Sequence, residues 1–225
     1  MEDSRDLILK TLRERSCLKQ DVYDHTLEVF NMLKEVCAEA IRDISEKFGD
    51  TDERVQFYFK DEGTHEAELK IAGDVLIFNM HTNVFLFDQS NSVWQTSYLK
   101  ENETNGYVGV INIYNFLADS IKYQRYNDAG YLIARIFVNR ENHFLVQGKR
   151  QLGYLYNDFI HAQMDKDTMR KIIDSALLYT MNFDLLVPPY QNVQEVSVAE
   201  IENTNHQLRV KTAKRLGFKF SFEDE

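Results

Sequence analysis

The feature that most restricts the fold of this 225-residue chain is a series of four short strand-like segments between residues 54 and 88, separated only by brief turns. Alternation of apolar and polar residues, as at Val55, Phe57 and Phe59, is typical of a half-buried strand. The segments 74–81 and 83–88 are more continuously apolar and predict central strands. Because parallel strands need long crossover connections, links this short predict an antiparallel meander.

Helical patterns flank this β-rich part. A short helix is expected to begin near Asp3 or Ser4, and a longer one covers roughly Lys19 to Phe48 with apolar residues three, four or seven apart. In the second half, helices are expected over 150–163, 165–182 and 203–216. Strand candidates there are 107–116, 130–139, 143–148 and 193–201, and Phe218, Phe220 and Phe222 form a last short one.

The whole pattern predicts a single α+β domain over 1–225, built on a largely antiparallel sheet of about six or seven strands. Its three parts are a helical N-terminal segment (1–49), a β-rich part (54–148) and a mostly helical part (152–216). A long N-terminal helix and C-terminal helices are expected to pack on the sheet.

Charge and cysteine content restrict the partners and the compartment. The formal net charge of −10 disfavours general nucleic-acid binding, which needs an excess of cations. No apolar run reaches the length of a membrane span, so no membrane partner is expected. The N-terminus carries acids where a signal peptide carries bases, and Cys17 and Cys37 lack metal or redox spacing. We therefore expect a cytoplasmic protein with free thiols; homo-oligomer formation stays open.

No catalytic motif of high specificity is present, so the sequence does not decide whether the chain is an enzyme. One weak metal candidate lies at Asp158, His161 and Asp165, which would share one face of a helix at spacings of three and seven. A second pattern, Asp61 followed by Glu66, Glu68 and Lys70 on a strand, is the arrangement that metal-dependent nucleases use. Both sets are also ordinary solvated charges, and opposed charges on an edge hairpin discourage aggregation.

A glycine-bordered basic turn is the candidate for anion binding. Lys149 and Arg150 lie between Gly148 and Gly153, where a strand leads into an expected helix whose first N–H groups are free. Together with the later strand, helix and Leu216-Gly217-Phe218, this part resembles the second half of a GNAT-type acetyltransferase. The resemblance implies that Gly148–Gly153 holds the pyrophosphate of acetyl-CoA, although Gln151 stands where the family has its middle glycine.

Three hypotheses for the function therefore stay open. The first is a binding or interaction module, with room for a small-ligand pocket on a curved antiparallel sheet under a long helix. The second is a CoA-dependent acyltransferase that uses the turn at Gly148–Gly153. The third is a metal-dependent hydrolase that uses Asp158, His161 and Asp165. An acyltransferase of this type predicts a splayed pair of parallel strands beside a helix that begins near Gly153.

Overall fold

One continuous helical stretch opens the structure, a computed structural model that describes residues 3–187, 189–192 and 194–199. It consists of α1 (Ser4–Thr11), a π-helical turn (Leu12–Ser16) and α2 (Cys17–Phe48). The side chain of Asp3 caps the start of α1, as expected, and Gly49 ends α2 with a φ of 56° that glycine adopts without strain. The sequence predicted two separate helices; the π turn joins them instead.

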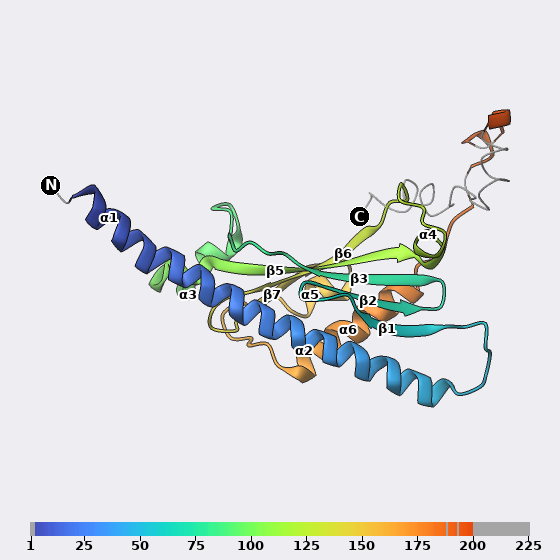
Figure 1. Ribbon diagram of the computed structural model, residues 1–225, viewed down its shortest axis with the longest axis horizontal. Coiled ribbons are helices and arrows are strands. Elements are labelled where there is room, and N and C mark those ends of the chain that lie inside the picture. The colour runs from blue at the N-terminus through green and yellow to red at the C-terminus, as the bar shows by residue number, and fades with distance from the viewer. Residues whose placement is uncertain (1–2, 188, 193, 200–225) are drawn as a thin grey trace.

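Seven antiparallel strands form the sheet. They are β1 (Phe57–Asp61), β2 (Glu66–Ile71), β3 (Asp74–Met80), β4 (Phe85–Leu86), β5 (Tyr107–Leu117), β6 (Tyr131–Val138) and β7 (Phe144–Gly148). The order is β1-β2-β3-β5-β6-β7, with β4 paired to β5 beside this path. The predicted meander is confirmed for β1, β2 and β3, whereas β4 does not continue it beside β3, and the chain is an α+β protein (Figure 1).

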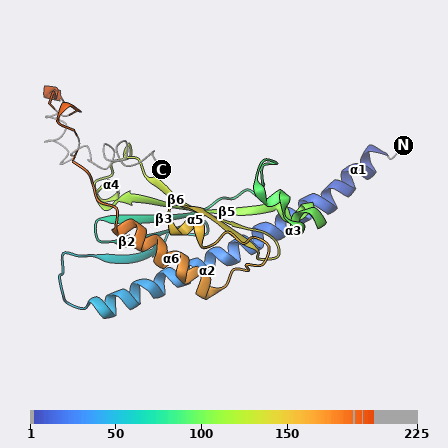
Figure 2. The ribbon, with the colours of Figure 1, turned by 180° about the vertical axis from the view of Figure 1, so that it is seen from behind.

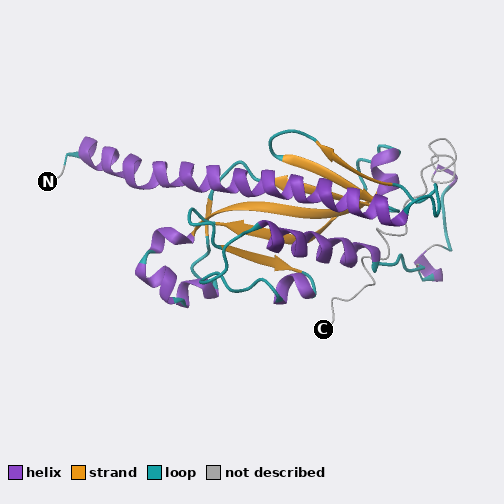
Figure 3. Cartoon of the chain, turned by 90° about the horizontal axis from the view of Figure 1, so that it is seen from below, coloured by secondary structure: helices purple, strands orange, loops and turns teal. Residues whose placement is uncertain are grey.

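Two helices cover one face of the sheet, as Figures 2 and 3 show: α2 and α6 (Lys166–Met181). The expected stripe of α2 is buried, with Val29, Leu33 and Val36 at most 1% exposed. It packs in one core cluster with apolar residues that alternate along the strands, such as Leu69 and Phe78. Alternate burial along each strand has thus placed the main core between the sheet and these two helices.

Part of the opposite face is covered by the segment between β4 and β5, which includes α3 (Ser97–Glu101). A second cluster forms there from Phe87, Val93, Leu99, Val108 and Phe159. The hydroxyl of Tyr98 donates to Glu141 Oε2 at 2.5 Å and accepts from Asn139 Nδ2 at 2.9 Å. These bonds tie the covering segment to the β6–β7 hairpin.

The helix predicted over 150–163 is wrong beyond Tyr154, because only α5 (Gln151–Tyr154) forms there. The residues that follow run instead along the outer edge of β7. Phe144 N of β7 donates to Ala162 O at 3.3 Å, and Val146 N donates to Tyr156 O at 3.0 Å. An exposed strand edge needs such partners, and satisfying it has outweighed the helical pattern.

Two further strand predictions need correction. Only Phe85 and Leu86 of the segment 83–88 form a strand, and both are exposed rather than central. The described part of the segment 193–201 contains no strand. The predicted last helix, Leu216-Gly217-Phe218 and the final phenylalanines lie outside the described residues. Within the part that is described, no helix is both long enough and apolar enough to cross a membrane.

Candidate functional site

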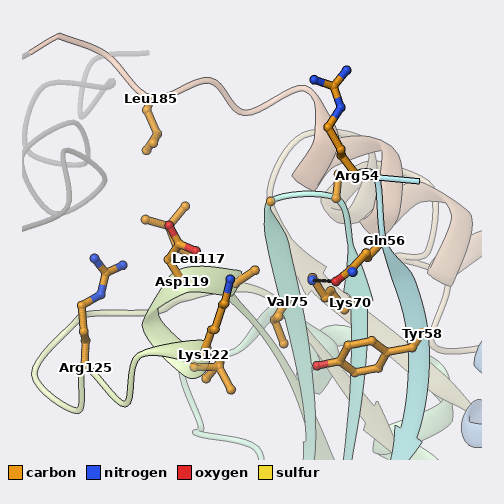
Figure 4. Close-up of a pocket in the computed structure, with 14 residues that line it drawn as sticks. Arg54, Gln56, Tyr58, Lys70, Val75, Leu117, Asp119, Lys122, Arg125 and Leu185 are labelled. Atoms are coloured by element: carbon orange, nitrogen blue, oxygen red, sulfur yellow. Dashed lines mark hydrogen bonds between the residues drawn. The ribbon is translucent and has the colours of Figure 1, made fainter. Parts of the chain in front are cut away.

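A pocket of about 890 Å³ lies on the sheet face opposite α2 and α6, near the end of the sheet where β2 turns into β3 (Figure 4). Its floor is formed by Tyr58 of β1, Lys70 of β2 and Val75 of β3. These residues point away from the core because their strand neighbours, such as Leu69 and Leu76, point into it. Strand alternation thus supplies a floor that is part aromatic, part apolar and part cationic.

The walls come from parts of the chain far from these strands. One wall is the end of β5 and α4 (Ala118–Lys122), which contribute Leu117, Asp119 and Lys122. Arg125 follows α4, and Leu185 lies beyond the end of α6 (Figure 4). The backbone of the β2–β3 turn closes one side, where Ala118 N donates to Gly73 O at 2.8 Å. The pocket therefore exists only when three distant parts of the chain come together.

Positive charge dominates the lining although the chain as a whole is acidic. Four lining side chains are cationic and one is a carboxylate: Arg54, Lys70, Lys122 and Arg125 against Asp119. Two of the cations already have carboxylate partners, because Arg54 pairs with Asp52 at 2.6 Å and Arg125 with Asp128 at 3.0 Å. The charge available to a ligand is therefore mainly that of the two lysines.

Lys70 and Lys122 both contact neutral groups. Lys70 Nζ donates to Gln56 Oε1 at 3.1 Å and lies 5.9 Å from the centre of the Tyr58 ring. Lys122 Nζ lies 5.1 Å from the centre of the Tyr123 ring. Neither an amide oxygen nor an aromatic face supplies an opposite charge, so these contacts leave both lysines able to attract an anionic ligand.

Tyr58 is held in the floor by a buried acid. Its hydroxyl donates to Glu68 Oε1 at 2.5 Å, and Glu68 is only 8% exposed. The pKa of Tyr58 is raised to about 12, first by burial and then by the hydrogen bond to the Glu68 carboxylate. The hydrogen bond fixes the position of the Tyr58 side chain, which offers its neutral ring to the pocket.

Arg125 is fixed by a small polar network. Its side chain is 7% exposed, and its Nη2 lies 3.4 Å from Ser120 Oγ. Ser120 Oγ in turn donates to Asp128 Oδ2 at 2.6 Å. A cation held this way keeps its position when a ligand arrives, which lowers the entropy cost of binding.

The turn that the sequence singled out for anion binding lies elsewhere. Gly148 ends β7, Gly153 lies in α5, and Lys149 and Arg150 between them are exposed. Lys149 N donates to Ile133 O, and Gly153 N donates to Arg150 O. A Cβ on Gly153 would stand 2.6 Å from the carbonyl oxygen of Gly148, so the close packing of this turn itself requires a glycine.

The three metal candidates do not share a helix face, because 155–165 is not helical. Asp158 and His161 do meet, with Oδ2 of the acid 3.1 Å from Nδ1 of the ring. Asp165 instead caps α6 by accepting from Thr168 N at 2.7 Å, and hydrogen bonds from the side chain and backbone of Thr168 lower the pKa of Asp165. Among the described residues, no three His, Cys, Asp or Glu side chains are grouped to hold a metal ion.

The acidic set around β2 is also divided among separate partners. Asp61 pairs with Lys34 of α2 at 2.7 Å. Glu68 accepts from Tyr58, and Lys70 donates to Gln56. Of these residues, only Lys70 lines the pocket.

No protein-family model, no curated protein and no solved structure matches the chain. The pocket must therefore be interpreted from its own residues.

The sequence predicted a pocket under the long helix, whereas this pocket lies on the opposite face of the sheet, so sequence reasoning missed it. The one local signal was the pair Lys122 and Arg125, which follows a long apolar strand within a few residues. This signal does not show that Lys70 and Tyr58 line the same pocket, because nothing local in the sequence relates β2 to α4.

Proposed function

We propose that this protein is a binding module whose pocket takes a small organic anion, with a carboxylate or phosphate group at Lys70 and Lys122. The observation that carries the proposal is the lining, with four cations and one acid in a chain of net charge −10. Lining cations in an acidic chain focus anions on one place. The volume also falls in the range of about 300–1,000 Å³ usual for small-molecule sites.

The apolar part of the lining indicates what else the ligand carries. Val75, Leu117, Ile121 and Leu185 lie beside the charged groups. A ligand with an apolar or aromatic body and one anionic end would use both kinds of surface. Tyr58, held in place by its hydrogen bond to Glu68, supplies a ring face for that body.

Calorimetric titration at low salt tests the proposal, with pyrophosphate, citrate and acetyl-CoA as probes. Saturable binding of at least one probe is expected, weakened at higher salt because the attraction is electrostatic. The variant Lys70→Ala/Lys122→Ala should lose that binding. The matched control is Lys149→Ala/Arg150→Ala, which removes two cations from the exposed turn and should bind like the wild type.

The opposite pattern of binding would place the anion site at the turn instead of the pocket. Binding of acetyl-CoA that only the Lys149→Ala/Arg150→Ala variant loses would favour the turn at Gly148–Gly153, and with it the acyltransferase hypothesis. No heat with any probe at concentrations up to about the millimolar range would rule out the pocket as an anion site of useful affinity.

A cytoplasmic location is part of the proposal. Its support is the exposed, free thiol of Cys17, which suits a reducing compartment.

A further inference from the structure

Among the described residues that line the pocket, Asp119 alone carries a negative charge. It lies in the first turn of α4 and is exposed. Within the part of the chain that the structure describes, its carboxylate makes no ion pair and accepts no hydrogen bond. A free acid in the lining repels a simple anion, so the lysines alone do not describe the ligand that suits this pocket.

The nearest lysine does not neutralise this acid. Lys122 follows Asp119 by three residues on α4, so the two side chains start on one face of the helix, about 5–6 Å apart. They do not pair, because Lys122 Nζ lies instead 5.1 Å from the centre of the Tyr123 ring. Figure 4 shows Asp119 and Lys122 on the wall of the pocket and Lys70 on its floor. An acid and a base therefore lie near each other with both charges available to a ligand.

The second lysine lies farther from the acid. Lys70 stands opposite Val75 in the sheet, and Val75 stands opposite Phe116. Two strand spacings, about 10 Å, thus separate Lys70 from Phe116, which precedes Asp119 by three residues. Asp119 is therefore accompanied by one ammonium group at short range, on Lys122, and by another at longer range, on Lys70.

We infer that the ligand is a zwitterion with an apolar side chain, of the amino-acid or short-peptide class. Its ammonium group pairs with Asp119, and its carboxylate pairs with Lys122 or Lys70. Leu117 and Ile121, which flank Asp119 in the lining, supply a surface for the apolar side chain. The inference rests on the proposed function, since it names the ligand class of the same pocket.

The two lysines suit zwitterions of different length. In a free amino acid the ammonium and carboxylate groups are attached to one carbon atom, which suits the neighbouring pair Asp119 and Lys122. Each further residue of a peptide separates the two groups by up to about 3.8 Å more, which suits Lys70. The pocket volume of about 890 Å³ has room for either ligand.

Calorimetric titration with three ligands that share a phenyl ring tests the inference. They are L-phenylalanine, 3-phenylpropionate, which lacks the ammonium group, and 2-phenylethylamine, which lacks the carboxylate. L-Phenylalanine should bind at least about 10-fold more tightly than either, because each analogue loses one pair of charges. The titrations contain EDTA, so that no metal ion can bridge Asp119 to an anion.

A dipeptide distinguishes the two sources of such a ligand. Phenylalanylphenylalanine is titrated beside L-phenylalanine into the wild type, Lys122→Ala and Lys70→Ala. The free amino acid should lose more affinity with Lys122→Ala, and the dipeptide should lose more with Lys70→Ala. The tighter of the two ligands identifies the length of zwitterion that the pocket prefers.

Replacing the acid tests its role directly. Asp119→Asn keeps the size of the side chain and removes its charge, so it should weaken binding of L-phenylalanine by about 10-fold. The same variant should bind 3-phenylpropionate at least as tightly as the wild type, because the repulsion is gone. The matched control is Asp167→Asn, which removes an exposed acid of α6 on the opposite face of the sheet and should bind L-phenylalanine like the wild type.

Two outcomes overturn the inference and leave the anion pocket standing. One is equal affinity of the wild type for L-phenylalanine and 3-phenylpropionate. The other is Asp119→Asn that binds L-phenylalanine as tightly as the wild type does. If neither the phenyl ligands nor pyrophosphate, citrate and acetyl-CoA bind, the proposed function fails and this inference fails with it.

Discussion

Gly109 of β5 lies directly beneath Thr26 of α2, so closely that a Cβ on the glycine would stand 2.0 Å from Thr26 Oγ1. Thr26 is fully buried, and its hydroxyl donates to Val22 O at 2.6 Å within the helix. The hydroxyl therefore cannot move aside without leaving a buried donor unpaired. Because Gly109 has no side chain, α2 can pack this closely against β5.

Gly109→Ala should consequently destabilise the protein by about 1–3 kcal/mol or more, as overpacking of a rigid core does. The free energy of unfolding in urea measures this. Gly73→Ala is the matched control, because a Cβ there meets nothing within 4 Å, and its effect should stay within about 0.5 kcal/mol. Equal stability of the two variants would show that α2 shifts freely over β5.

Two leucines of the same helical stretch provide a second test. Leu33 is fully buried in the main core, and Leu12, in the π turn between α1 and α2, is about half exposed. Leu33→Ala should cost about 2–5 kcal/mol, the usual effect of a cavity in a packed core. Leu12→Ala should cost less than about 1 kcal/mol. A small effect at Leu33 would mean that α2 is peripheral to the fold.

The elements that depend on local patterns were predictable from the sequence. The stripe of α2 and the meander are examples, because each needs only the period of the apolar residues and the length of the turns. The same holds for α6, where Ile172, Ile173 and Leu177 are buried as expected, although Met181 at its end is exposed.

Features that depend on pairing between distant segments were not predictable. The segment 155–165 has a helical pattern, yet its backbone pairs with the edge of β7. The pocket brings Lys70 of β2 beside α4, about fifty residues later in the chain. The positions of these residues depend on strand order and register, which cannot be read from local sequence patterns.

The two cysteines should differ sharply in reactivity. They are twenty residues apart on one helix, about 30 Å at 1.5 Å per residue, too far for a disulfide within the chain. Burial raises the pKa of Cys37 far above its usual value, so its thiolate is scarce. Ellman's reagent should modify one thiol in native protein, at Cys17, and two after unfolding. Rapid reaction of both in native protein would show that the core around Cys37 opens readily.

The last prediction concerns the floor of the pocket. The pKa of Tyr58 is raised to about 12, first by burial and then by its bond to Glu68. Because the folded pKa lies above the unfolded value of about 10, the folded state holds this proton more tightly. The resulting stabilisation is complete below about pH 10 and is lost as the pH rises through about 12.

Tyrosinate absorbance at 295 nm, recorded after rapid jumps to alkaline pH and before unfolding, should therefore contain one transition near pH 12 that Tyr58→Phe lacks. Glu68→Gln should move that transition to lower pH, because an amide accepts the hydrogen bond without carrying the charge that opposes ionisation. Tyr58→Phe should also make the free energy of unfolding fall less steeply between about pH 10 and 12 than in the wild type. A transition that stays in place when Glu68 is replaced would mean that burial alone sets the pKa, and that the hydrogen bond contributes nothing to holding Tyr58 neutral in the pocket.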